Sequence, residues 1–123
     1  MNDEQRELKI KQILERGTED IFPKDQLEAQ LRSGKVLRVK LGFDPTSSHI
    51  HIGRAIVLRK LKAFQDLGHQ IIFLIGDFTA RIGDPTDKTS ARKQLTEKEI
   101  KTNLKLYKKQ AEKFISFSGK NAA

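Results

Sequence analysis

The chain has 123 residues, of which 37% are apolar and 33% charged, a composition that fits one soluble domain and excludes a disordered or membrane-embedded chain. It contains no cysteine, which excludes a disulfide framework and a thiolate metal site, and its charged amino terminus shows no signal peptide, so we expect a cytoplasmic protein. The net charge of +8 suits a polyanionic partner such as a nucleotide or RNA, although charge alone is explained more simply by a solvated basic surface.

Two short helices are predicted at the amino-terminal end of the chain. Within residues 4–16, Leu8, Ile13 and Leu14 recur at helical spacing among charged residues. Residues 23–34 repeat the pattern, opening at a proline, closing at a glycine and carrying two leucines four residues apart. We expect both helices to lead into the main part of the fold.

A strand, a helix and a second strand are predicted next. Residues 36–44 alternate between apolar and basic side chains, which is the period of a strand. Residues 52–67 then follow a helical period. Their apolar face comprises Val57, Leu61, Phe64 and Leu67. Residues 70–77, "QIIFLIGD", are apolar at consecutive positions, which is typical of a strand covered on both faces in a parallel sheet.

The last third of the sequence predicts a loop, one more helix and a polar trailing end. Residues 76–96 are dense in glycine, aspartate and threonine, which indicates a loop or a broken helix. Residues 97–115 predict a helix with these residues on its apolar side: Ile100, Leu104, Tyr107, Ala111 and Phe114. Its other faces carry Lys101, Lys105, Lys108 and Lys113. We favour a solvated surface over an RNA contact for these lysines.

The order of elements predicts an α/β fold with a parallel sheet and flanking helices. We assign residues 1–34 to a helical lead-in and residues 35–123 to a unit of strand, helix, strand, loop and helix. Two parallel strands leave open edges and apolar surface, so we expect an incomplete part of a larger sheet that tends to self-associate.

Polar and cationic residues gather between the first strand and the helix that follows it. In an open α/β sheet, ligands bind beyond the carboxyl ends of the strands, where the start of a helix directs free N–H groups outward. His51 and Arg54 are three residues apart and share one side of a first helical turn, while Gly53 lets a ligand approach the backbone. With the hydroxyl of Thr46, they predict a pocket for a polyphosphate.

Two simpler interpretations compete for the histidines. His49 and His51 could bind a metal from an extended segment, but the chain has no cysteine and only His69 as a further histidine. An isolated H-x-G could equally belong to an ordinary helix start. The threonine five residues before His51, following a predicted strand, favours the phosphate pocket without deciding the matter.

The segment "GFDPTSSHIHIGR" resembles the HIGH signature region of the class I aminoacyl-tRNA synthetases. Together with "FLIGDFTARIGDPTDKTSARKQLT", it is similar to the bacterial tyrosyl-tRNA synthetases, and the combination of "IGDPT" and "ARK" is far more specific than H-x-G alone. The resemblance runs from about Ile13 to the end. It implies a Rossmann-like (HUP-type) catalytic domain that joins tyrosine to ATP, releases pyrophosphate and transfers the tyrosyl group to tRNA(Tyr), in a homodimeric enzyme.

The resemblance also implies a set of site residues. Those expected to bind ATP are Gly42, Asp44, Thr46, His51, Gly53 and Arg54. Those expected to bind the amino acid are Asp44, Thr79 and Asp84. Those expected to act in catalysis are Thr46, His51, Arg54, Lys88 and Arg92, the last two from a loop that reaches the pyrophosphate. Mg²⁺ is expected to accompany ATP, and no metal bound by the protein alone is expected.

Several of these residues would also fit an ordinary structural role, or depart from the family pattern. Asp84 precedes a proline and could equally start a turn, and Lys88 and Arg92 in isolation would be ordinary loop charges. The signature ends in Arg54 in place of histidine, which keeps a charge but changes its reach. Lys40 stands where some members of the family have a tyrosine near the substrate phenol.

Members of the family continue through a second α/β half, a KMSKS loop and an anticodon-binding region. From the 123 residues we expect the N-terminal half of a catalytic domain, with weak or absent activity. One alternative is a small nucleotidyltransferase of the same superfamily, which would ignore tyrosine. The other is a noncatalytic RNA-binding module, whose binding would depend steeply on salt and not on His51.

Overall fold

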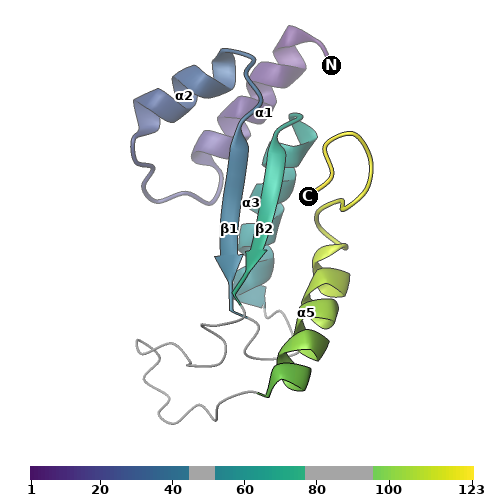
Figure 1. Ribbon diagram of the computed structural model, residues 1–123. Coiled ribbons are helices and arrows are strands. Elements are labelled where there is room, and N and C mark those ends of the chain that lie inside the picture. The colour runs from purple at the N-terminus through teal and green to yellow at the C-terminus, as the bar shows by residue number, and fades with distance from the viewer. Residues whose placement is uncertain (45–51, 77–95) are drawn as a thin grey trace.

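The computed structural model describes residues 1–44, 52–76 and 96–123 of the chain (Figure 1). Its elements are α1 (Asp3–Glu15), α2 (Lys24–Arg32), β1 (Arg38–Phe43), α3 (Ile52–Asp66), β2 (Gln70–Ile75) and α5 (Glu97–Ala111). Figure 1 shows α1 and α2 beyond the starting ends of the strands, α3 behind them and α5 alongside. The predicted α/β class is confirmed. None of the helices in these ranges has both the length and the apolar character that crossing a membrane requires.

β1 and β2 form a parallel pair and are connected through α3, as the sequence predicts. Their register runs from Arg38 opposite Gln70 to Phe43 opposite Ile75. The ladder extends one step further, because the Gly76 N–H donates to the Phe43 carbonyl at 2.9 Å. Both strands therefore end at the same level, and the chain leaves both of them at one edge of the sheet. This arrangement is a partial Rossmann-like sheet.

The described residues cover the sheet on one face only, so β2 lacks the second cover that its apolar run is typical of, and part of its apolar surface is exposed, as expected for an incomplete sheet. Residues of the covered face pair as Val39 with Ile71, Leu41 with Phe73 and Phe43 with Ile75. The core of α3 and residues 111–117 pack with this face. The other face carries Arg38, Lys40, Gly42, Gln70, Ile72 and Leu74, and Leu74 is 50% exposed. α3 and the residues after α5 lie on the same side of the sheet. The apolar sequence of β2 therefore did not show whether one face or both faces of the strand are covered.

α1 begins at a capping box and turns one face into the core. The Asn2 side chain accepts a hydrogen bond from the Gln5 N–H at 2.8 Å, and the Gln5 side chain accepts one from the Asn2 backbone N–H. The core positions of the helix are Ile10, Ile13 and Leu14. Leu8, predicted with them, is 57% exposed. The predicted spacing was correct, but the centre of the buried face lies nearer the carboxyl end.

α2 is fastened to α1 by charged side chains at the surface and by apolar contacts below. Arg32 pairs with Glu7 at 2.6 Å and also with Glu28. Arg6 donates from Nη2 to the Leu31 carbonyl at 3.1 Å. The core cluster joins these two helices to the rest of the fold through Ile10, Ile13, Leu14 and Leu31. The division of the chain after residue 34 stays a prediction.

The buried face of α3 differs from the predicted face at one position, where Leu58 is buried in place of Val57. Leu58 is fully buried, whereas Val57 is 39% exposed. Leu61 and Phe64 are buried, as predicted. One residue is about 100° of helix rotation, and Val57 and Leu58 are both apolar, so the sequence could not tell which of them faces inward.

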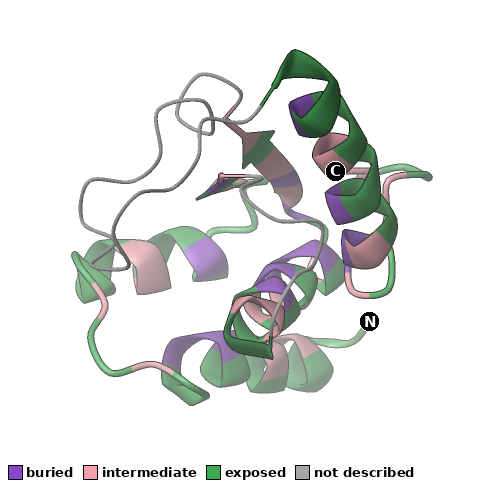
Figure 2. Cartoon of the chain, turned by 90° about the horizontal axis from the view of Figure 1, so that it is seen from below, coloured by how far each residue is buried: buried purple, intermediate pink, exposed green. Residues whose placement is uncertain are grey.

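α5 is shorter than predicted and is amphipathic. A capping box between Thr96 and Glu99 starts it, and it ends at Ala111 rather than at residue 115. Figure 2 shows the buried residues of α5 on its inner side and exposed residues on the outer one. The four lysines predicted on its outer faces are exposed: Lys101, Lys105, Lys108 and Lys113. Their exposure agrees with a solvated surface, and the choice between that and an RNA contact stays a prediction.

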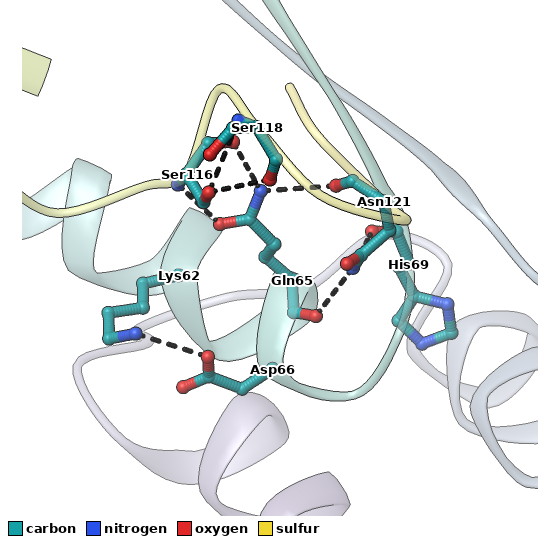
Figure 3. Close-up of polar contacts among 7 residues, drawn as sticks. All are labelled: Lys62, Gln65, Asp66, His69, Ser116, Ser118 and Asn121. Atoms are coloured by element: carbon teal, nitrogen blue, oxygen red, sulfur yellow. Dashed lines mark hydrogen bonds and ion pairs between the residues drawn. The ribbon is translucent and has the colours of Figure 1, made fainter. Parts of the chain in front are cut away.

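The predicted polar trailing end is wrong, because residues 115–123 pack back onto α3 and β2. Ile115 is 1% exposed. The Gln65 side chain donates to the Ser116 carbonyl and accepts from the Ser116 N–H, each at 2.8 Å. Asn121 donates to the Gln65 and His69 carbonyls, as Figure 3 shows. Gln65 is 8% exposed, so this network satisfies a buried polar side chain.

Candidate functional site

The end of the sheet and the start of α3 meet at one edge of the molecule. β1 ends at Phe43 and is followed by Asp44, and α3 begins at Ile52. The first turn of α3 lies against the end of β1, because Arg54 reaches the Asp44 carbonyl at 3.4 Å. The sequence placed its candidate pocket at this edge, beyond the carboxyl ends of parallel strands.

Arg54 is the best-defined side chain of this edge. Its Nη1 donates a 2.6 Å hydrogen bond to the Tyr107 hydroxyl and the longer one to the Asp44 carbonyl. Its guanidinium carbon lies 5.6 Å from the centre of the Phe43 ring and 5.7 Å from that of Tyr107. Arg54 therefore joins three elements, α3, the end of β1 and α5.

The two aromatic rings lie against the guanidinium and limit its movement. Tyr107 is fully buried and Phe43 is 8% exposed, so neither ring can move far without disturbing the core. Cation–π contacts at these distances add to the hydrogen bond. Among the described residues, only Nη1 makes hydrogen bonds, which leaves the Nη2 and Nε hydrogens of Arg54 for a further acceptor.

Three more predicted site residues lie at or near this edge. Gly42, near the end of β1, is exposed on the open face of the sheet, and a Cβ there would meet none of the described atoms within 4 Å. The described part of the chain therefore leaves space in front of Gly42. Gly53 is exposed in the first turn of α3, and Asp44 is half-buried. The structure thus brings Gly42, Asp44, Gly53 and Arg54 to one region.

The remaining predicted site residues lie outside the described residues. They are Thr46, His51, Thr79, Asp84, Lys88 and Arg92, together with His49 of the alternative metal pair. Their roles stay predictions. In the described ranges, no group of three or more histidine or acidic side chains is arranged to hold a metal ion.

Sequence reasoning missed Phe43 and Tyr107 as partners of the candidate site. Tyr107 was predicted on the apolar side of its helix, and its burial confirms that. Nothing in the sequence linked its hydroxyl to Arg54, which is 53 residues away. The available signal was weak: the only tyrosine of the chain lies on this otherwise non-polar face and carries its one hydroxyl.

The sequence of the chain is similar to a known protein family and to several curated proteins. The family described as "tRNA synthetases class I (W and Y)" matches residues 32–121, from the end of α2 to the packed tail. The chain is 54% identical over 107 residues to the tyrosine–tRNA ligase of Moorella thermoacetica, covering 84% of this chain and 26% of that protein.

Two further relatives agree. Identity is 50% over 103 residues to the tyrosine–tRNA ligase of Xanthomonas axonopodis pv. citri, covering 84% of this chain and 26% of the ligase. It is 49% over 102 residues to tyrosine–tRNA ligase 2 of Pseudoalteromonas translucida, covering 83% of this chain and 26% of the ligase. The chain spans about a quarter of the length of the curated relatives it matches. The family match includes both strands, α3 and α5, and on this evidence the chain belongs to the class I tRNA synthetases of the tryptophan and tyrosine group.

Proposed function

We propose that this chain is part of a tyrosine–tRNA ligase and supplies the ATP side of its active site. The observation that carries the proposal is the identity of about half of the aligned residues with tyrosine–tRNA ligases. The open, cationic edge formed by Gly42, Gly53 and Arg54 supports it, because adenylation needs a site where a nucleotide lies against backbone and phosphate charge is balanced.

The reaction requires no protein nucleophile. A carboxylate oxygen of tyrosine attacks the α-phosphorus of ATP, the bond to the bridging oxygen breaks, and pyrophosphate leaves. In the second step a ribose hydroxyl of the terminal adenosine of tRNA(Tyr) attacks the tyrosyl carbonyl carbon, its proton passes to solvent, and AMP leaves. The protein contributes position and charge stabilisation in both steps.

Within the described residues, Arg54 is the group best placed to act on phosphate charge. The contacts with Tyr107 and the Asp44 carbonyl hold its guanidinium at the start of α3, where the helix N–H groups also favour an anion. Gly42 leaves space for the adenosine. The other proposed roles belong to Thr46 and His51 at the phosphates, Thr79 and Asp84 at the ammonium group, and Lys88 and Arg92 at the pyrophosphate.

Mg²⁺ is proposed to arrive with ATP. Its hard charge prefers phosphate oxygens and water, and it needs few protein ligands when bound to a nucleotide. The half-buried carboxylate described at this edge is Asp44, one potential oxygen ligand rather than a cage. tRNA(Tyr) as second substrate and a homodimeric assembly are proposed from the same relationship to tyrosine–tRNA ligases.

A chimera tests this function without depending on the activity of the short chain. The segment of the Moorella thermoacetica ligase that aligns with this chain is replaced by the sequence of this chain, and tyrosine-dependent exchange of labelled pyrophosphate into ATP is measured. We expect exchange with tyrosine and none with tryptophan. His51→Ala in the chimera should lower the rate by about 10²-fold, the usual cost of one donor at a developing charge.

Three results would count against the proposal. A folded chimera without exchange would show that this segment cannot serve tyrosine adenylation. Exchange unaffected by His51→Ala would remove the phosphate pocket from the mechanism. Exchange driven by a substrate other than tyrosine would favour the nucleotidyltransferase alternative or another amino acid.

A further inference from the structure

A second cavity lies at the opposite end of the sheet from the candidate site. It has a volume of about 230 Å³ and is formed by α1, the end of α2 and the segments that lead into β1 and β2. Its polar lining comprises Arg6, Lys35 and His69. Residues 34–36 precede β1 and His69 precedes β2, so the cavity faces the amino-terminal ends of the strands. Neither the family relationship nor the proposed function uses this place.

The tautomer of His69 follows from its hydrogen bond. His69 as a residue is 6% exposed, and its Nδ1 accepts a hydrogen bond from the Leu37 N–H at 3.1 Å. In a neutral imidazole, an accepting Nδ1 means that Nε2 carries the proton and is a donor. Figure 3 shows the His69 ring turned away from the Gln65–Asn121 network. His69 is one of the residues that line the cavity, and its Nε2–H is a donor that a ligand there could use.

The Arg6 side chain is held at the cavity by a hydrogen bond and does not extend freely into solvent. Its Nη2 donates to the Leu31 carbonyl at 3.1 Å. The same Nη2 lies 3.6 Å from the position that a Cβ would take on Gly34, and Gly34 has a φ of +79°. The loop therefore runs close over the guanidinium, and Arg6 has about four further N–H hydrogens to offer.

The described residues that line the cavity carry more positive than negative charge. The residues that line it include Arg6, Lys35 and no carboxylate. Two glutamates on the adjoining helices, Glu7 and Glu28, are both paired with Arg32, and Glu7 also interacts electrostatically with Arg6. Burial lowers the pKa of His69, and the charge of Arg6 lowers it further. Converging like charges repel one another unless an anion lies between them, and a concave site concentrates the field.

We propose that this cavity binds a phosphate group through the Arg6 guanidinium, the Lys35 ammonium and the Nε2–H of His69. The ligand is inorganic phosphate or the phosphate of a small phosphomonoester. Guanidinium and ammonium groups provide the charge, and the buried imidazole N–H provides direction. The site is independent of the proposed adenylation, because it lies at the other end of the strands.

Proton NMR of the intact chain tests the proposal with inorganic phosphate as the probe. The ring proton resonances of His69, assigned by their loss in His69→Asn, are followed at about pH 7.5 while phosphate replaces chloride at constant ionic strength. We expect a saturable shift and a rise in the pKa of His69, because a bound anion favours the imidazolium. Arg6→Gln should weaken binding by about tenfold, as expected for one charge-assisted contact. Lys35→Gln, in an exposed loop, should weaken it as well.

The control is Lys11→Gln, which removes an exposed charge of α1 that does not line the cavity. Its affinity should stay within about twofold of the unsubstituted chain, since screening limits distant charges. Glycerol 3-phosphate in the same titration distinguishes the ligand sources: tighter binding than phosphate identifies an organic phosphate, and weaker binding identifies the free ion. A shift that chloride reproduces, or Arg6→Gln and Lys35→Gln binding phosphate like the unsubstituted chain, would overturn the proposal.

Discussion

Arg54 and Tyr107 form a partly buried contact that joins the start of α3 to α5. The hydrogen bond from Arg54 Nη1 to the Tyr107 hydroxyl is 2.6 Å long, and the guanidinium also lies against the Tyr107 ring. The signature that this region resembles ends in histidine where this chain has Arg54. In this chain the residue at that position, Arg54, therefore contacts a core side chain and also faces the candidate site.

Removal of the Tyr107 hydroxyl should cost stability. Tyr107→Phe keeps the ring but leaves the Arg54 guanidinium without its shortest hydrogen bond, and hydrogen bonds to charged groups contribute about 1.5–3 kcal/mol. We expect the free energy of unfolding in urea, followed by circular dichroism, to fall by about 2 kcal/mol. The control is Thr102→Val, which removes an exposed hydroxyl of the same helix and should change stability by less than about 0.5 kcal/mol. Equal effects of the two variants would contradict the contact.

Arg54→His, which restores the residue of the signature, should release Tyr107. An imidazole is shorter than an arginine side chain and cannot reach the hydroxyl while staying over both rings. Tyr107 is the only tyrosine and the chain has no tryptophan, so tyrosine fluorescence reports this one ring. We expect a change in emission and a loss of stability of about 1–2 kcal/mol.

A double-mutant cycle gives the matching test of that contact. Arg54→His and Tyr107→Phe, combined, should be less destabilising than the sum of the single variants by about 1 kcal/mol, because both remove the same interaction. Additive effects would show that the two residues act independently.

Lys60 should contribute more to the free energy of unfolding than its neighbour Lys62. Lys60 Nζ donates to the Ile13 carbonyl at 2.8 Å and to the Arg16 carbonyl at 2.6 Å, so it caps the end of α1. Burial and the charge of Arg16 lower its pKa, but its ammonium form supplies all of these bonds. Lys60→Met should lower the free energy of unfolding by about 2 kcal/mol.

Lys62→Met is the matched control for that substitution. Lys62 forms an exposed ion pair with Asp66 at 3.1 Å, and such pairs contribute about 0–1 kcal/mol. If Lys60→Met were no more destabilising than Lys62→Met, the contact of Lys60 with the end of α1 would contribute nothing measurable to stability. Hydrogen exchange at the last turn of α1 should rise in Lys60→Met alone.

His69 should make stability fall as the pH falls. Its folded pKa is lowered from 6.5, so the unfolded chain binds the proton first, and stability is full above about pH 6.5 and decreases below it. Burial is the larger cause of this shift, and the charge of Arg6 acts in the same direction. His69→Asn keeps an acceptor for the Leu37 N–H but does not titrate, and it should flatten the urea-unfolding profile between about pH 7.5 and 5. Identical slopes in both proteins would contradict the predicted role of His69.

The periodic parts of the fold could be predicted from the sequence, because they follow from local patterns. The alternation of residues 36–44 and the helical period of residues 52–67 gave strand, helix and strand in the order found. The face that each helix buries was less certain. Leu8 and Val57 are apolar but exposed, because neighbouring apolar residues compete for the core and only tertiary packing decides between them.

Contacts between distant segments could not be predicted. The end of the chain reads as polar, yet Asn121 and the backbone of Ser116 are bonded to Gln65, more than 50 residues earlier. The exposure of Leu74 depends on which face α3 and the tail cover. At the candidate site, the sequence located Arg54 correctly at the end of the sheet but gave no sign of its partner on α5.

The central claim, that ATP binds at the edge where β1 ends and α3 begins, is tested most directly by amide NMR of this chain during titration with ATP and Mg²⁺. We predict saturable shifts at the amides of Gly42, Gly53 and Arg54, with a change in the Tyr107 ring signals, and loss of these shifts in His51→Ala. Saturable shifts confined to other parts of the chain, with these three amides and the Tyr107 ring unmoved, would contradict the claim.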